Sequence, residues 1–256
     1  MADIAQPKTV VHARRFGVSL AVLPLALGAW AVLVWMMMDM DHPFSRLTMP
    51  GAWRWSAFNA IAIWGMWAVM MIAMMLPSAF PMIRTFVSLS ARSGEYWRGW
   101  TFVGAYLAVW LLFSVGATVL QWALQALDWV DAMTVSRSSV LTAALLLIAG
   151  IYQFSPLKRR CLFRCRTPLG FLLGEWRPGT YGAWVMGVRH GMYCVGCCWA
   201  LMALLFVGGA MNLAWVVALS VAVALEKWLP FAKQLSLALG GLLIGAGLIK
   251  MLVLAS

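Results

Sequence analysis

Charged residues are scarce in this chain, and acidic residues are the scarcest of them. Only 11% of the 256 residues are charged, with 8 Asp and Glu against 19 Lys and Arg, whereas charged residues make up about a quarter of a soluble domain. This leaves too little polar surface to cover a globule in water, which excludes a soluble enzyme and predicts that lipid surrounds much of the chain. Since 64% of the residues are hydrophobic, we expect an all-α, polytopic protein of a prokaryotic-type inner membrane.

Two kinds of sequence motif are missing as well. The first residues, MADIAQPKTVVHARRF, are polar and basic, and no small-residue cleavage site follows the first apolar run, so we expect that run to be a retained helix rather than a signal peptide. Neither a GxxxxGK[ST] nor a DKTG string occurs, which argues against ATP-driven transport.

The net charge of +11 would favour a nucleic acid partner in a soluble protein, but these charges lie in short loops and indicate membrane topology and anionic headgroups instead.

Seven apolar segments approach the length of about 20 residues that a spanning helix needs. They are Val18–Met38, Ala57–Ile83, Thr101–Trp122, Ser138–Phe154, Ala183–Val207, Leu213–Trp228 and Phe231–Leu254. Basic residues concentrate in the N-terminal segment and in every second loop after it, which predicts a cytoplasmic N-terminus and a C-terminus outside. We therefore divide the chain into a cytoplasmic N-terminal segment, residues 1–17, and a single transmembrane domain, residues 18–256. Within it, the pairs Gly187/Gly191 and Gly241/Gly245 predict close helix approach.

The fifth apolar segment contains the densest set of metal-binding side chains, in the string HGMYCVGCC. Each residue of a helix advances about 100°, so His190, Cys194, Cys197 and Cys198 fall on one stripe of this segment. Thiolates and an imidazole on one stripe are suitable ligands for a soft metal ion. The alternative is that the cysteines are small hydrophobic residues in a packed interface.

Two further cysteines, Cys161 and Cys165, lie in the basic string KRRCLFRCR before that segment. Their spacing of four residues would put both thiols on one side of a helical turn. Because this loop adjoins the fifth segment on the predicted inner face, all five cysteines of the chain are candidates for one site. The alternative is an ordinary reduced pair in a loop whose arginines determine topology.

Methionines follow one another at helical spacing along the second apolar segment. Thioether is a soft, neutral ligand that suits Cu(I), although a flexible packing surface is the alternative explanation. Pro77 and Pro81 should kink this helix and free the carbonyl groups of Ala73 and Pro77. The candidate ligands of this segment are Met66, Met70, Met71, Met74, Met75 and Met82.

Two polar groups at segment ends have open roles. The run MMMDMDH, residues 36–42, ends the first segment on the predicted outer face; it is either a copper-collecting site or a solvated helix end. Glu226 and Lys227 lie near the predicted inner end of the sixth segment, where ionisable side chains suggest function. They either pair with each other or extend to the surface, or Glu226 supports the cysteine site through a metal ligand.

The strings MMxAMMxP and CxGCCWxLM, together with the loop Lys158–Phe171, resemble a bacterial family of predicted metal-binding integral membrane proteins of unknown function. The resemblance covers most of the chain from the second apolar segment onward, whereas the first segment and its MMMDMDH end do not match. It implies metal binding, and a role in copper handling has been suggested for such proteins.

Three functions are compatible with these patterns. In the first, the protein is not an enzyme but handles Cu(I) as a chaperone, insertion factor or transporter: outer groups collect copper, the methionines pass it through the bilayer, and the inner cysteines deliver it to an acceptor protein or a copper enzyme under assembly. In the second, Cys194 and Cys197 form the redox pair of a membrane thiol-disulfide oxidoreductase; their predicted place on the reducing side argues against this. The third is a zinc-binding structural or sensory protein, since Cys₃His is a common structural zinc set.

Overall fold

The computed structural model describes residues 8–51, 55–91, 95 and 97–255, and almost all of them are helical. Within these ranges the only extended pairing is an isolated antiparallel bridge between Val130 and Ser136, which confirms the all-α class. The helices are α1 (Lys8–Met38), α2 (Pro43–Leu47), α3 (Ala57–Ser90), α4 (Trp97–Ala126), α5 (Ser139–Gln153), α6 (Pro156–Arg166), α7 (Pro168–Glu175), α8 (Gly179–Ala203), α9 (Leu205–Gly208), α10 (Leu213–Trp228) and α11 (Ala232–Ala255).

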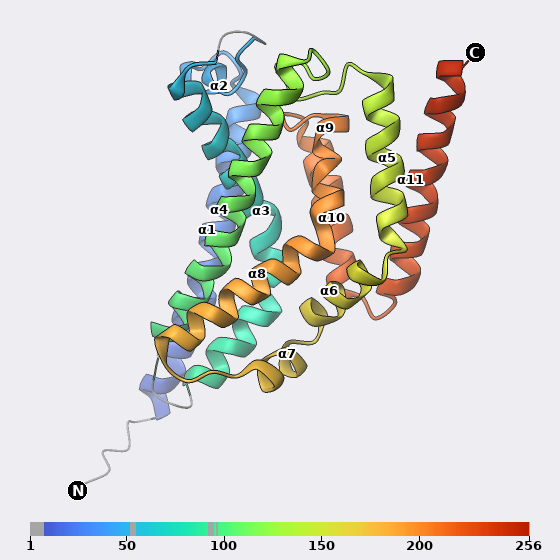
Figure 1. The fold of residues 1–256 in the computed structure, drawn as a ribbon. Helices are drawn as coiled ribbons and strands as arrows, with labels where there is room; N and C mark the ends of the chain where they lie inside the picture. The colour runs from blue at the N-terminus through green and yellow to red at the C-terminus, as the bar shows by residue number, and fades with distance from the viewer. Residues whose placement is uncertain (1–7, 52–54, 92–94, 96, 256) are drawn as a thin grey trace, which may run out of the picture.

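The long helices form a bundle, with α5 and α11 side by side along one edge (Figure 1). Helix α3 packs against α1 and α4, and α4 packs against α8. Helix α1 begins at the lower end of the bundle in Figure 1, where α6 and α7 also lie, and α11 ends at the upper end. The basic segment that contains Cys161 and Cys165 thus lies at the end where α1 begins.

Local capping explains where several of these helices begin. The Ser56 hydroxyl accepts a hydrogen bond from the backbone of Asn59, and the Asn59 side chain accepts one in return, which makes a capping box at the start of α3. Ser138, Ser155 and Asn212 cap α5, α6 and α10 in the same way with side-chain oxygens. Capping residues next to each helix in the sequence therefore determine where these helices begin.

Five helical stretches among the described residues are long and apolar enough to cross a membrane: α1, α3, α4, α8 continued through α9, and α11. Helices α5 and α6 meet the same test only together, and they are bent by 64° at the break between them. Helix α10 has 16 residues, about 24 Å of rise, which is shorter than the hydrocarbon thickness of about 30 Å. All seven predicted segments are helical, whereas the number of spans and their orientation stay predictions.

Glycines determine how closely two of the helix pairs approach. A Cβ atom on Gly187 would lie 2.5 Å from the carbonyl oxygen of Phe102, and one on Gly191 would lie 2.9 Å from Val109, which confirms the predicted close contact of α8 with α4. The prediction for Gly241 and Gly245 is wrong, since neither has a neighbour within 4 Å. The face of α11 that packs on α5 instead presents Gly240 and Gly247.

Candidate metal centre

The thiol of Cys194 on α8 is the centre of a cluster of sulfur atoms. Cys194 is fully buried, and the thiols of Cys165, Cys197 and Cys198 are each within hydrogen-bonding reach of its own. Cys197 and Cys198 also donate to the Cys194 carbonyl oxygen, at 3.1 and 2.9 Å. The cysteine stripe expected on α8 is thus a single buried group that faces inward.

Helix α6 contributes the fourth thiol of this cluster. The break between α5 and α6 turns α6 toward α8, and the Cys165 thiol reaches those of Cys194 and Cys197. Cys161 packs at the edge of the cluster, because a Cβ atom on Gly196 would lie only 2.8 Å from its Sγ. All five cysteines are free thiols. Of the two cysteines on α6, Cys165 therefore reaches the thiols of α8, whereas Cys161 packs beside them.

Two of the six candidate methionines adjoin the thiols. The Met75 Sδ lies 3.9 Å from the Cys198 Sγ, and Met82 lines a cavity together with Cys165. Since Met66 is nine residues before Met75, it lies about 14 Å away along the axis of α3. The remaining candidates continue this buried row away from the thiols: Met66, Met70, Met71 and Met74.

A lysine that the sequence analysis assigned elsewhere contacts the central thiol. The Lys227 ammonium group on α10 lies 3.0 Å from the Cys194 Sγ and donates to the Ser78 hydroxyl at 2.8 Å. Glu226 instead binds the ammonium of Lys158 at 2.7 Å and accepts a hydrogen bond from Ser236. Two of the alternatives for these residues, mutual pairing and extension to the surface, are therefore wrong: both side chains are buried, and since successive helical residues point about 100° apart, Glu226 faces α6 and α11 and Lys227 faces α8.

Tyr106 on α4 is a second partner of the thiols that the sequence analysis missed. Its hydroxyl donates to the Met75 carbonyl oxygen at 3.1 Å and lies 3.3 Å from the Cys194 Sγ. The signal for this contact was a tyrosine within an apolar segment, because a buried phenol needs a hydrogen-bond partner. The close approach of α4 and α8 at Gly187 brings this hydroxyl to the thiol.

His190 is buried one turn before Cys194, inside a cage of aromatic rings. Its ring centroid lies 5.5 Å from that of Tyr106, 5.7 Å from Phe171 and 6.0 Å from Phe102. Among the described residues the His190 Nδ1 has no hydrogen-bond partner, which is an unusual and costly state for a buried nitrogen. The ring is thus adjacent to the thiols and has an uncommitted nitrogen atom.

The described part of the chain contains no group of three or more His, Cys, Asp and Glu side chains already arranged to hold a metal ion. The contacts above give a physical reason. Cys197 and Cys198 bond to a backbone carbonyl, and the Lys227 ammonium is the cation beside the Cys194 thiol. Binding a metal would therefore require small rotations of these side chains.

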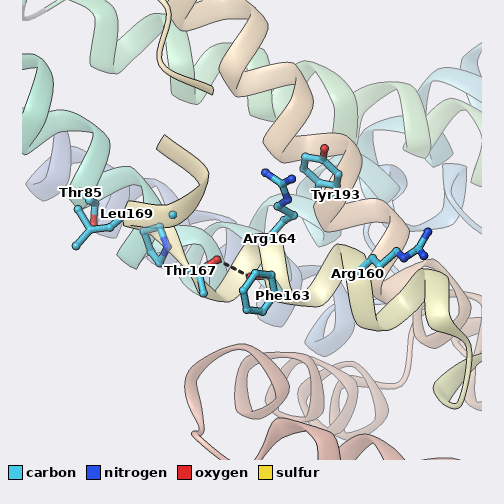
Figure 2. Close-up of a pocket in the computed structure, with 9 residues that line it drawn as sticks. Thr85, Arg160, Phe163, Arg164, Thr167, Leu169 and Tyr193 are labelled. Atoms are coloured by element: carbon cyan, nitrogen blue, oxygen red, sulfur yellow. Dashed lines mark hydrogen bonds between the residues drawn. The ribbon is translucent and has the colours of Figure 1, made fainter. Parts of the chain in front are cut away.

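Two hollows lie on the lower face of the bundle. One of about 210 Å³ adjoins the thiols and is lined by Ser78, Pro81, Met82, Cys165, Arg166, Pro168, Lys227 and Trp228. The other, of about 1030 Å³, is lined by Arg160, Arg164, Tyr193 and neighbouring residues of α3, α6 and α7 (Figure 2). No cysteine lines this larger hollow, whereas the smaller one reaches the thiol cluster at Cys165.

The outer run MMMDMDH forms local contacts rather than a shared site. Asp41 pairs with Arg46 at 3.1 Å, and both side chains are exposed. The His42 Nδ1 accepts from the backbone of Phe44, and its ring packs edge-on against Trp35. The alternative of a solvated helix end fits these contacts.

Comparison with known proteins gives one match. No curated protein and no solved structure matches the chain. A family model does match, over residues 64–250, and that family is described as PpoB2, copper chaperone. The matched region contains the methionine row, α6, the cysteines of α8 and Lys227. Because the match covers more than half of the chain, this protein belongs to the PpoB2 copper chaperone family.

Proposed function

We propose that this protein is an integral membrane copper chaperone that holds Cu(I) at the thiols of Cys194, Cys197 and Cys198 and releases it to an acceptor. The observation that carries the proposal is the burial of Cys194, Cys197 and Cys198 together on α8, with the Lys227 ammonium and the Tyr106 hydroxyl beside the Cys194 thiol. Few soft donors of this kind gather in a protein interior without a metal or redox role, and the family membership favours copper.

The neighbouring thioether favours Cu(I) over zinc. Met75 lies 3.9 Å from Cys198, and thioether donors suit Cu(I), whereas structural Zn²⁺ is bound by thiolate, imidazole and carboxylate. In the described residues no carboxylate contacts these thiols, because Glu226 is bound to Lys158. The uncommitted Nδ1 of His190 is the additional donor nearest in sequence to Cys194.

Charge balance gives Lys227 a role in this function. Cu(I) bound by two thiolates has a net charge of −1, and burying such a charge without a partner is costly. The Lys227 ammonium, 3.0 Å from the Cys194 sulfur, supplies the compensating positive charge. Ser78 and Tyr106 then hold the ammonium and the sulfur in position through their hydroxyl groups.

The proposal also includes how the protein lies in the membrane and how copper crosses it. The apolar helices insert as a multi-pass bundle in the bacterial inner membrane, and the thiol end faces the cytoplasm because α6 is rich in Lys and Arg. The buried row from Met66 to Met75 would carry Cu(I) between the outer half and the thiols by exchange between weak sites. Chaperoning without transport uses the same thiols and needs only the inner end of the row.

Anaerobic Cu(I) binding by purified protein tests this function. The triple substitution Cys194→Ser, Cys197→Ser and Cys198→Ser should abolish binding, whereas Cys161→Ser, which changes a thiol at the edge of the cluster, should keep the stoichiometry. If the triple variant binds Cu(I) with unchanged affinity and stoichiometry, the proposal is wrong. Zinc in protein purified without added metal would favour the zinc alternative.

A further inference from the structure

The smaller hollow on the lower face contains both soft donors and positive charge. Its lining includes Cys165 and Met82, which have soft donor atoms, and Lys227 and Arg166, which are cationic. Cys165 is the cysteine of the cluster that is only partly buried, whereas Cys194, Cys197 and Cys198 are almost completely buried. A molecule in this hollow would therefore meet Cys165 before any other thiol of the cluster.

The cationic groups of the hollow have unused binding capacity. The Arg166 Nη2 donates to the Leu229 carbonyl oxygen, but its buried Nε has no hydrogen-bond partner in the part of the chain that the structure describes. Lys227 is 7% exposed and has no carboxylate partner among the described residues, since its contacts are a hydroxyl and a thiol. Since the Lys227 charge compensates the Cu(I)–thiolate complex, Arg166 is the cation of the hollow that favours an anionic guest.

The size of the hollow limits the guest. A volume of about 210 Å³ is below the range of roughly 300–1,000 Å³ that is typical of sites for drug-sized ligands. The guest must therefore be a small molecule, or at most one extended side chain. Because a thiol and a thioether line the hollow, the atom of the guest that reacts there is one that binds Cu(I).

We propose that this hollow is an exchange port in which a small anionic thiol exchanges Cu(I) with Cys165. The inference rests on the proposed function and adds to it the route and the chemical class of the exchange partner. Cys165 bridges the two regions, because its thiol reaches Cys194 and Cys197 inside and lines the port outside. The other thiols hold the ion, and Cys165 passes it on.

The exchange balances without an oxidant or reductant. The sulfur of a first incoming thiol forms a bond to copper and releases its proton, while the bond between copper and the Cys165 sulfur breaks. The Cys165 thiolate that is released takes up a proton. A second incoming thiol then replaces the remaining cysteine ligand in the same way, and that cysteine thiolate also takes up a proton. Copper remains Cu(I) throughout, and the reverse sequence would load the site.

Three small thiols of similar size and different charge test the port on the full-length protein: mercaptoacetate, 2-mercaptoethanol and cysteamine. Protein loaded anaerobically with Cu(I) is mixed with each thiol, and the copper still bound is measured after timed desalting. We expect mercaptoacetate to remove copper at least about tenfold faster than cysteamine, because the cations of the port attract it. Arg166→Gln should reduce that preference.

The variant Cys165→Ser should slow removal by mercaptoacetate about tenfold or more, with the rate expressed relative to the Cu(I) that the variant has bound at the start. Cys161→Ser, one helical turn away and outside the port, is the matched control and should not change the rate. Unchanged rates in Cys165→Ser, or the same charge preference in Arg166→Gln, would overturn the port while copper binding itself stands. A wild-type protein that binds no Cu(I) would overturn the proposed function as well.

Discussion

Single side chains around Cys194 have separable roles in the site. Cys194 contacts three other thiols, an ammonium group and a phenol, more partners than any other cysteine has. We expect Cys194→Ser to lower Cu(I) affinity by more than about 100-fold, above the range typical of residues that act through a ligand. Competition with a Cu(I) chelator of known affinity measures this, and an effect no larger than that of Cys161→Ser would contradict the central position of Cys194.

Lys227 gives a second prediction for a single residue. Lys227→Met removes the positive charge beside Cys194 but keeps a side chain of similar length, so the anionic Cu(I)–thiolate complex loses its partner. Cu(I) affinity should fall about tenfold, and Lys227→Arg should retain most of it. The same competition assay measures both variants. Tighter binding by Lys227→Met would mean that the ammonium competes with copper instead of compensating its ligands.

The sequence predicted which cysteines share a face of α8 better than it predicted what surrounds them. Helical periodicity puts Cys194, Cys197 and Cys198 on one stripe, and they are indeed buried together. The contacts of Lys227 and Tyr106 with Cys194 join residues 33 and 88 positions apart, and no local pattern encodes such distances. The assignment of Glu226 failed for the same reason, because its partner Lys158 lies on another helix, 68 residues away.

At the scale of the helices, the ion pair between Lys158 and Glu226 ties α6 to α10. Both side chains are almost completely buried, and Gln153 and Ser236 complete their hydrogen bonds. Removing one partner leaves a buried charge uncompensated, so Glu226→Gln should lower the free energy of unfolding by about 3–5 kcal/mol. Chemical denaturation in detergent measures this. The double variant Lys158→Met and Glu226→Leu should recover much of the loss, and a double variant as unstable as the single one would contradict the explanation.

The contact of α4 with α8 depends on glycine at position 187. Gly187→Ala would push a methyl group against the Phe102 carbonyl oxygen, at 2.5 Å, and we expect a loss of about 1–3 kcal/mol from overpacking. Gly241→Ala is the matched control, since a Cβ atom there meets nothing within 4 Å. Thermal unfolding of the two variants distinguishes them. Equal melting temperatures would mean that α4 can move away from α8 at little cost.

The sequence predicted the helical segments well because apolar runs are a local signal, whereas helix packing is not. The seven apolar segments are all helical, and Ser56, Ser138 and Ser155 begin three of the helices. The choice of Gly241 and Gly245 as a contact face failed because four-residue spacing alone does not say which side of α11 meets α5. Nor did the apolar run reveal that the fourth segment ends in a 64° break, which brings Cys165 to the thiols.

For the whole molecule, the two ends of the bundle differ in charge and chemistry, which predicts its orientation. The basic helix α6 lies in the lower half of the bundle in Figure 1, and the loop between α4 and α5 lies at the upper end. The positive-inside rule places the basic end in the cytoplasm. In intact cells a membrane-impermeant maleimide should label Asp128→Cys, whose native side chain is exposed in that upper loop. It should label Arg159→Cys on α6 only after the membrane is permeabilised, and the unsubstituted chain gives the background from its own buried cysteines. Labelling of Arg159→Cys in intact cells would reverse the orientation and put the thiol cluster on the oxidising side, where free thiols would favour the oxidoreductase over the chaperone.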